Sequence, residues 1–242
     1  MAVKVGICGF AKSQAGVFRE FELLEIQQTF YKPPKARTAE GWRRKAPDEF
    51  EFTAKAWQLI THEPSSPTYR KARLAIPPER SSRYGAFRPT EEVFDAWRRT
   101  KAVCEALRAT VIVFQTPDSF GPIPRNKENL YAFFRSIDRG SFVLAWEPRG
   151  PWPLHVVERI CEDLGLQHAT DPFARELVDQ PRAYYRLHGS PPGPKMYAYA
   201  YTDEDLRKLL GFCDEVDDAW VLFNNVTMYD DALRFLDLVR QR

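Results

Sequence analysis

Cysteine is scarce in this sequence, and its four copies lie far apart. Cys8, Cys104, Cys161 and Cys213 are separated by 96, 57 and 52 residues. Zinc sites and redox motifs need closely spaced pairs, so no local pair predicts either. Cys104 and Cys161 fall on apolar helical stripes, where a free cysteine acts as a small hydrophobic residue. We therefore expect a reduced, cytoplasmic protein, and one long-range disulfide is the alternative.

The sequence also lacks an apolar run near the roughly 20 residues that span a bilayer. Its first residues, Met1 to Lys4, run directly into a strand-like pattern, so we expect neither a membrane span nor a secretory signal. Net charge is nearly absent, because 35 Lys and Arg face 33 Asp and Glu. A hydrophobic share of 44% in 242 residues excludes intrinsic disorder and is enough for one large domain.

Strand-like segments recur through the whole chain. Most are continuous apolar runs, such as 111–114 and 220–223, which are typical of parallel strands that are covered on both faces. Amphipathic helical patterns lie between most of them, at 90–108, at 154–164, after a capping motif at 202–205, and at 228–239. The eight strand-like segments are 4–10, 23–31, 50–57, 110–115, 142–146, 166–169, 183–188 and 219–224.

This alternation predicts an α/β fold, a single (β/α)8 barrel of the TIM type over residues 1–242. A doubly wound open sheet is the alternative. No glycine-rich phosphate loop follows its first strand, however, and Gly6 and Gly9 alone are a weak signal. Only residues 11–22 separate the first two strands, so the first crossover must be short or irregular.

The barrel prediction selects the candidate site residues, because such barrels carry their chemistry at the C-terminal ends of the strands. Polar side chains that end apolar strands are costly unless they are paired or used. The catalytic candidates, as acids, bases or orienting groups, are Glu25, His62, Glu147 and His188. The substrate-binding candidates are Tyr31, Lys55, Gln115, Arg149, Arg186, Asn224 and Asn225.

Each of these candidates also has a structural interpretation. Glu25, Lys55 and Arg186 are equally consistent with a buried ion-pair network. The two asparagines suit a cap of the last helix, and His188 suits a bond to a loop backbone. Their origin on different strands that meet at one mouth favours a shared site. Alternation puts Arg186 and His188 on the same side of the seventh strand, and we expect that side to face the barrel interior.

Residues 64–90, here called the basic segment, form the most unusual stretch. It holds six cations against one acid, Glu79, and Tyr69, Tyr84 and Phe87 lie among them. We expect a mobile cover on the C-terminal face, with cations that contact phosphates and rings that pack on bases or on the rim. A solvated insertion is the alternative. The six cations are Arg70, Lys71, Arg73, Arg80, Arg83 and Arg88.

Five short motifs lie at or near strand ends between residues 24 and 225. They are LEIQQTFY at 24–31, FTAKA at 52–56 with ITH at 60–62, FQTP at 114–117, YRLHG at 185–189 and FNN at 223–225. In this order and spacing they resemble the barrel proteins of the domain of unknown function 72 family. The resemblance implies a TIM barrel and no established reaction.

The chain departs from that family's pattern at three places. Gln27-Gln28 stands where the family usually shows an Asn-Ser pair, and Val226 where it shows an Asp. The run Glu147-Pro148-Arg149-Gly150 replaces an acid-aromatic-Arg-His run. The resemblance therefore implies a site that is modified in this chain.

Three classes of function follow. We favour an enzyme, such as a hydrolase, that acts on an anionic, phosphate-bearing substrate (a nucleic acid or a sugar phosphate), because cations outnumber carboxylates at the strand ends. The second is a divalent-metal-assisted hydrolase or isomerase that uses Glu25, Glu147, Asp171, His168 and His188. The third is a non-catalytic adaptor that binds single-stranded nucleic acid through the basic segment. The substrate, the cofactor, any metal and the oligomeric state stay open.

Overall fold

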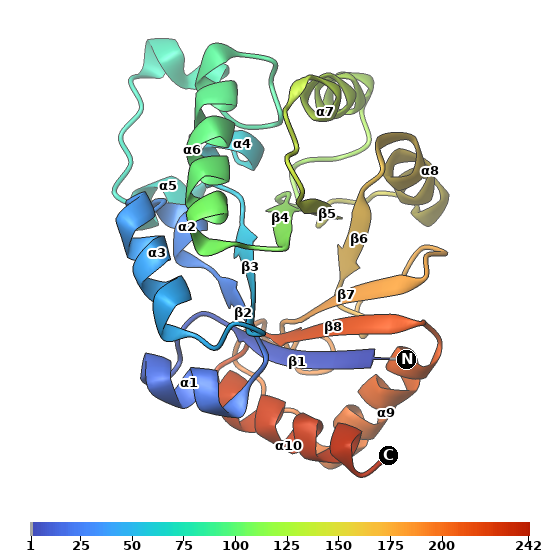
Figure 1. Cartoon of the computed structure of the whole chain (residues 1–242). Helices are drawn as coiled ribbons and strands as arrows, with labels where there is room; N and C mark the ends of the chain where they lie inside the picture. Colours follow the sequence, from blue (N-terminus) through green and yellow to red (C-terminus); the bar gives the residue numbers. More distant parts are fainter. Residues whose placement is uncertain (1) are drawn as a thin grey trace.

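Eight parallel strands close into a barrel in the computed structural model, which describes residues 2–242 (Figure 1). Each strand pairs with its neighbours in chain order, and β1 closes the ring beside β8. The prediction of a (β/α)8 barrel is confirmed. The strands are β1 Ala2–Cys8, β2 Leu23–Ile26, β3 Glu51–Lys55, β4 Val111–Gln115, β5 Val143–Glu147, β6 Gln167–Thr170, β7 Arg182–Leu187 and β8 Asp218–Phe223.

Helices pack around the outside of the ring (Figure 1). The capping motif predicted at Thr202 is present, since the side chains of Thr202 and Asp205 each bond the other's backbone N–H at the start of α9. The longer helices are α3 Ala36–Lys45, α6 Glu91–Leu107, α7 Pro124–Ser136, α8 Leu154–Leu164, α9 Asp203–Asp214 and α10 Met228–Arg240. The shorter ones are α1 Gln14–Glu20, α2 Gln28–Tyr31, α4 Gln58–Thr61, α5 Pro67–Lys71 and the 3-10 helix η1 Pro78–Arg83.

The first crossover is short, as the sequence predicts. Its helix, α1, has seven residues and is capped by Ser13, whose hydroxyl accepts the N–H of Gly16. The second strand is shorter than predicted, because the chain turns into α2 directly after Ile26. The Thr29 hydroxyl lies 2.8 Å from the carbonyl oxygen of Ile26 and 2.6 Å from that of Lys55. This hydroxyl holds the turn against the end of β3.

Alternate strand residues divide the apolar interior into two layers. Leu23, Val113, Ala145, Tyr184 and Leu222 point inward and fill the barrel, while most other apolar side chains form the larger core between strands and helices. The inward positions continue up the same strands to the C-terminal mouth. The inward residues at that mouth are Glu25, Lys55, Gln115, Glu147, Arg186, His188 and Asn224.

The basic segment is anchored by its aromatic residues. Phe87 is fully buried, with ring centroids 5.3 Å from those of Phe133 and Phe134. Tyr69 is 2% exposed and donates its hydroxyl to the carbonyl of His62 at 2.9 Å. The expectation that these two rings stack on bases is wrong, because both belong to the core. Gly85 permits the tight path, since its φ is +74° and an added Cβ would lie 2.2 Å from the His62 carbonyl oxygen.

The remaining expectations about the chain concern its thiols and the membrane. All four cysteines are buried and unpaired, so no long-range disulfide forms. Burial raises the pKa of Cys161 and of Cys213 to about 12, which leaves both thiols protonated at neutral pH. Within residues 2–242, none of the helices is long and apolar enough to cross a bilayer.

Candidate functional site at the barrel mouth

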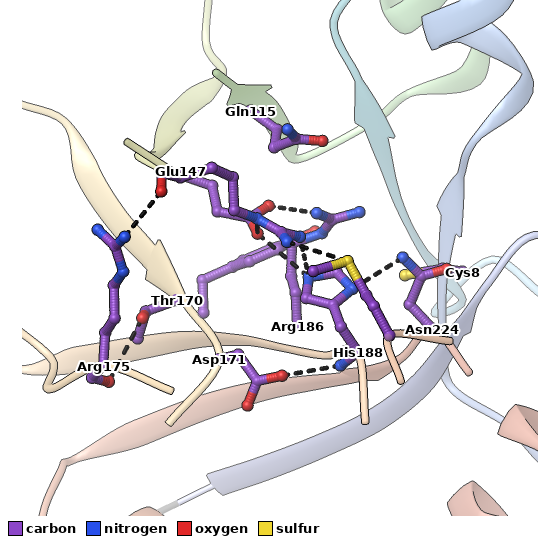
Figure 2. A network of polar contacts seen from close by, with 12 residues as sticks. Cys8, Gln115, Glu147, Thr170, Asp171, Arg175, Arg186, His188 and Asn224 are labelled. Carbon is purple, nitrogen blue, oxygen red and sulfur yellow. Dashed lines mark hydrogen bonds and ion pairs between the residues drawn. The ribbon is translucent and has the colours of Figure 1, made fainter. Parts of the chain in front are cut away.

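Arg186 is the centre of the polar network in the mouth (Figure 2). Its side chain is 1% exposed, and it donates to both carboxylate oxygens of Glu25, at 3.0 Å from Nε and 2.6 Å from Nη2. Its Nη1 donates to Glu147 on β5. The charges of these two carboxylates outweigh burial and raise the pKa of Arg186 well above its ordinary value. Arg186 therefore ties β2, β5 and β7 together as a buried ion-pair network.

Glu25 has further partners below and beside Arg186. The Tyr184 hydroxyl donates to Glu25 Oε2 at 2.9 Å and lies 2.7 Å from the Thr53 hydroxyl on β3. The side-chain amide of Gln27 donates to Glu25 Oε1, and the Cys8 thiol lies 3.6 Å from the same oxygen. Glu25 is fully buried and satisfied on both oxygens. It acts as a structural carboxylate that orients Arg186.

A second group of side chains extends the network from Glu147 toward solvent. Glu147 Oε1 accepts Arg149 Nε at 2.6 Å and lies 3.1 Å from His188 Nε2. Burial raises the pKa of Glu147, but the charges of Arg149 and Arg186 outweigh it and hold the pKa well below its ordinary value. Glu147 is therefore ionised at neutral pH. It orients its neighbours rather than supplying a proton.

His188 is a neutral imidazole in this setting. Burial, followed by the charge of Arg149, lowers its pKa to about 3. Arg149 Nη2 lies 2.5 Å from His188 Nε2, and a guanidinium can only donate, so Nε2 accepts this hydrogen bond. The ring proton then belongs on Nδ1. The Asn224 amide nitrogen, 3.1 Å away, can only donate, so the amide accepts this proton through its oxygen once the amide is turned over. Asp171 accepts the backbone N–H of His188 at 2.8 Å and fixes the end of β7 (Figure 2).

Lys55 enters the mouth from β3 with few polar partners. Its residue is 7% exposed, and its Nζ donates to Gln115 Oε1 at 2.7 Å and lies 3.8 Å from the centre of the Phe30 ring. Burial, followed by the charge of Arg186, lowers the pKa of Lys55 to about 7. Within residues 2–242, no carboxylate oxygen lies within 4.0 Å of this Nζ. Lys55 is thus a titratable amine at neutral pH.

His62 and Tyr31 lie on the same side of the mouth, around Phe30. The His62 ring contacts the Phe30 ring at a centroid distance of 5.0 Å, and its Nδ1 lies 2.8 Å from the Thr61 hydroxyl. Burial, followed by the charge of Lys55, lowers the pKa of His62 to about 3. The ring of Tyr31 lies 5.1 Å from Lys71 Nζ in the basic segment. His62 is consequently neutral and enclosed, while Tyr31 forms part of the rim.

Asn225 does not face the mouth. Its side-chain amide donates to Asp231 Oδ2 at 2.7 Å and to the carbonyl of Tyr199 at 2.7 Å. This bond to Asp231 joins the end of β8 to the first turn of α10, as the capping interpretation expects. His168 is similarly structural, because its Nδ1 accepts the N–H of Val178 at 3.3 Å. Of the two asparagines, only Asn224 reaches the network.

Half of the cations in the basic segment are paired with acids. Arg80 and Arg83 both bind Glu92 on α6, at 3.0 Å and 2.5 Å, and Arg88 binds Glu63. The expected repulsion among six uncompensated cations is therefore reduced. The cations for which the structure shows no acid within 4.0 Å, among residues 2–242, are Arg70, Lys71 and Arg73.

Tyr184 and Met196 belong to the network although no sequence pattern singles them out as site residues. In the sequence, Tyr184 has the pattern of an ordinary core residue of a strand. Its position two residues before Arg186 nevertheless places both side chains on the inward face of β7. Met196 lies in the loop after β7, and its sulfur is 3.6 Å from Arg149 Nη1. No periodic pattern marks this loop. Its contact with the mouth follows only from the folded chain.

The part of the chain that the structure describes contains no ligand set for the divalent-metal-assisted hydrolase or isomerase. Residues 2–242 contain no group of three or more His, Cys, Asp or Glu side chains arranged to hold a metal ion. Both central carboxylates, Glu25 and Glu147, are instead bound by arginines. The residues present therefore fit an organic anion better than a cation.

Comparison with known proteins shows the family to which this barrel belongs. The model of the family described as "Protein of unknown function DUF72" matches residues 17–242, so the chain belongs to the DUF72 family. The UPF0759 protein YunF of Bacillus subtilis (strain 168) is 25% identical over 246 residues, which cover 88% of this chain and 80% of YunF. The family resemblance seen in the sequence is confirmed.

Solved structures of the same family share the fold. A DUF72 family protein from Enterococcus faecalis V583 superimposes with a TM-score of 0.73 at 16% identity, covering 99% of this chain and 98% of that one. Another, from Thermotoga maritima MSB8, gives a TM-score of 0.68 at 21% identity, covering 99% and 100%. At these identities the likeness shows the barrel alone, so the activity must be argued from the mouth.

Proposed function

We propose that this protein is an enzyme that binds a small, phosphate-bearing substrate at the C-terminal mouth of the barrel. Arg149 and Lys55 bind the anion, and His188 acts as the base. The observation that carries the proposal is the distribution of charge. Arg186 is neutralised by two carboxylates and Arg149 shares Glu147 with Arg186, whereas Lys55 has no carboxylate partner among residues 2–242.

Arg149 is the best-placed group for a phosphate. Its side chain is 16% exposed, and among residues 2–242 its Nη1 has only the weak contact with the Met196 sulfur. A guanidinium offers a planar pair of donors that matches two phosphate oxygens. Arg186, a substrate-binding candidate in the sequence, is enclosed by Glu25 and Glu147 and therefore lies outside the proposed phosphate site.

Substrate binding also supplies a way to activate His188. In the free protein, Arg149 donates to the Nε2 lone pair that a base would use. A phosphate that takes over Nη2 of Arg149 releases this lone pair and compensates the charge that lowers the pKa of His188. The imidazole then accepts a proton more readily at Nε2, and Glu147 Oε1, 3.1 Å away, stabilises the protonated ring by accepting that N–H.

Calorimetric titration tests this proposal with ribose 5-phosphate and, as the matched ligand, ribose. We expect the phosphate ester to bind at least tenfold more tightly than the free sugar. Arg149→Gln should remove most of that preference, since one charge-assisted pair contributes about 1.5–3 kcal/mol. Arg135→Gln, on the outer helix α7, is the matched control and should bind as the parent does. Equal binding of both ligands by the parent would refute the proposal.

Two other expectations, nucleic-acid binding by the basic segment and a cytoplasmic setting, are secondary to the proposed site in the mouth. Nucleic-acid binding through the basic segment has less support, because three of its six cations are paired and two of its three rings are in the core. A cytoplasmic setting, expected from the unpaired cysteines, is part of the present proposal. Neither affects the test of the mouth.

A further inference from the structure

Lys55 has surroundings that differ from those of an ion-pairing lysine. Buried ammonium groups normally have a carboxylate partner, because burial of an uncompensated charge is costly. Here the partner is the neutral amide of Gln115, whose own N–H donates to the carbonyl of Thr116 at 3.0 Å. That second bond orients the amide with its oxygen toward Lys55. Gln115 thus orients the amine without the strong stabilisation of the ammonium form that a carboxylate would supply.

The aromatic neighbours of Lys55 have a similar effect. Lys55 Nζ lies 3.8 Å from the centroid of the Phe30 ring, and the ring of His62 packs edge-on against Phe30. A ring face attracts an ammonium ion more weakly than a carboxylate does. Gln115, which contacts the amine, is half-buried, so Lys55 lies below the rim rather than in the deep core.

We propose that Lys55 Nζ is a nucleophile that forms an imine with a carbonyl carbon of the substrate, which is therefore a keto or aldehydo sugar phosphate. This inference rests on the proposed function, because Arg149 is the group that holds the phosphate. It adds covalent catalysis to the anion contact that the proposed function gives to Lys55. The depressed pKa of about 7 supports it, since a sizeable fraction of the amine is then unprotonated at neutral pH.

The proposed step balances without an external reagent. The nitrogen lone pair bonds to the carbonyl carbon, and the carbonyl π pair moves to oxygen, which takes a proton from the attacking amine. The resulting carbinolamine loses its hydroxyl group together with the second amine proton as water, and a C=N bond remains. Gln115 directs the amine throughout, and Arg149 retains the phosphate.

Reductive trapping tests the imine directly. The parent is incubated with dihydroxyacetone phosphate and sodium cyanoborohydride, which delivers hydride to the C=N carbon and leaves a stable secondary amine. Peptide mass spectrometry then measures the adduct at Lys55 and, as an internal reference, at the exposed Lys35. We expect at least 100-fold more adduct at Lys55 than at Lys35. The yield at Lys55 should increase with pH with a midpoint near pH 7, whereas an ordinary lysine has its midpoint near its pKa of about 10.4.

Two variants separate this inference from the proposed function. Lys55→Arg keeps a positive charge but no nucleophilic amine, so it should still bind ribose 5-phosphate and give no adduct at position 55. Lys55→Met, which packs similarly without charge, should also give no adduct and should bind the phosphate more weakly. Near-ultraviolet circular dichroism of both variants confirms that they are folded.

The outcomes are distinct. No excess adduct at Lys55 in a parent that binds ribose 5-phosphate overturns the imine and leaves the proposed function standing. Equal labelling of Lys55 by dihydroxyacetone and by its phosphate supports the nucleophile and overturns the phosphate site. Preferential labelling by the phosphate supports both.

Discussion

At the scale of single residues, the mouth contains two kinds of arginine. Arg186 and Arg149 lie in one network and both contact Glu147, yet their exposures are 1% and 16%. Arg186 is enclosed by carboxylates, while Arg149 turns one nitrogen toward the loop after β7. Burial and pairing thus separate a structural guanidinium from one that is open to a ligand. The sequence could not distinguish them, because both lie near strand ends in basic surroundings.

Replacement of Arg186 should accordingly lower the stability of the fold. Arg186→Met would leave Glu25 and Glu147 buried without their shared cation, which typically costs 3–5 kcal/mol. We expect a loss of about that size in the free energy of unfolding, measured by urea denaturation. Arg149→Met, at the exposed end of the network, is the control and should cost about 1 kcal/mol or less. A similar loss for both variants would contradict the distinction.

At the scale of elements, the sequence predicted strands better than it predicted connections. Strand-like segments located all eight strands, and most of these segments are continuous apolar runs because inward and outward faces are both covered in a barrel. The end of β2 was missed, since Thr29 closes it through a bond to the backbone of another strand. The charge of the basic segment predicts a mobile cover, whereas its pairing with Glu92 and the burial of Phe87 depend on tertiary contacts that the sequence does not show.

Charge reversal in the basic segment tests its pairing with α6. Arg80→Glu with Arg83→Glu would place two new carboxylates against Glu92, whose side chain is 12% exposed. We expect η1 to loosen, with faster proteolysis within 64–90 and a loss of about 1 kcal/mol in stability, because the arginines are half exposed. The matched Arg80→Gln, Arg83→Gln variant should lose about half as much. An unchanged proteolysis rate in both would indicate a segment that is solvated without these pairs.

At the scale of the whole molecule, three buried histidines make the fold sensitive to acid. The pKa values of His62 and His188 are lowered to about 3 and that of His168 to about 4, first of all by burial. The unfolded chain binds these protons near pH 6.5, so this stability is present above pH 6.5 and is lost as the pH falls toward 4. Asp171, whose pKa burial raises to about 6, opposes the trend, because its contribution is regained on acidification.

His168→Asn isolates one of these contributions away from the mouth. Asparagine offers an oxygen to the Val178 N–H that His168 Nδ1 now accepts, and it does not titrate. Between pH 7 and pH 5, the variant should lose about 2 kcal/mol less stability than the parent. Urea denaturation at both pH values measures the difference. Identical losses in the two proteins would mean that His168 is not buried as a neutral ring.

The central claim is that the barrel mouth holds a phosphate on Arg149. A crystal structure of the protein with ribose 5-phosphate tests it most directly. We predict phosphate density within hydrogen-bonding distance of the Arg149 guanidinium, with the sugar extending toward Lys55 and the contact between Arg149 and His188 broken. Phosphate density only against Arg70, Lys71 and Arg73, with the mouth unchanged, would contradict the account.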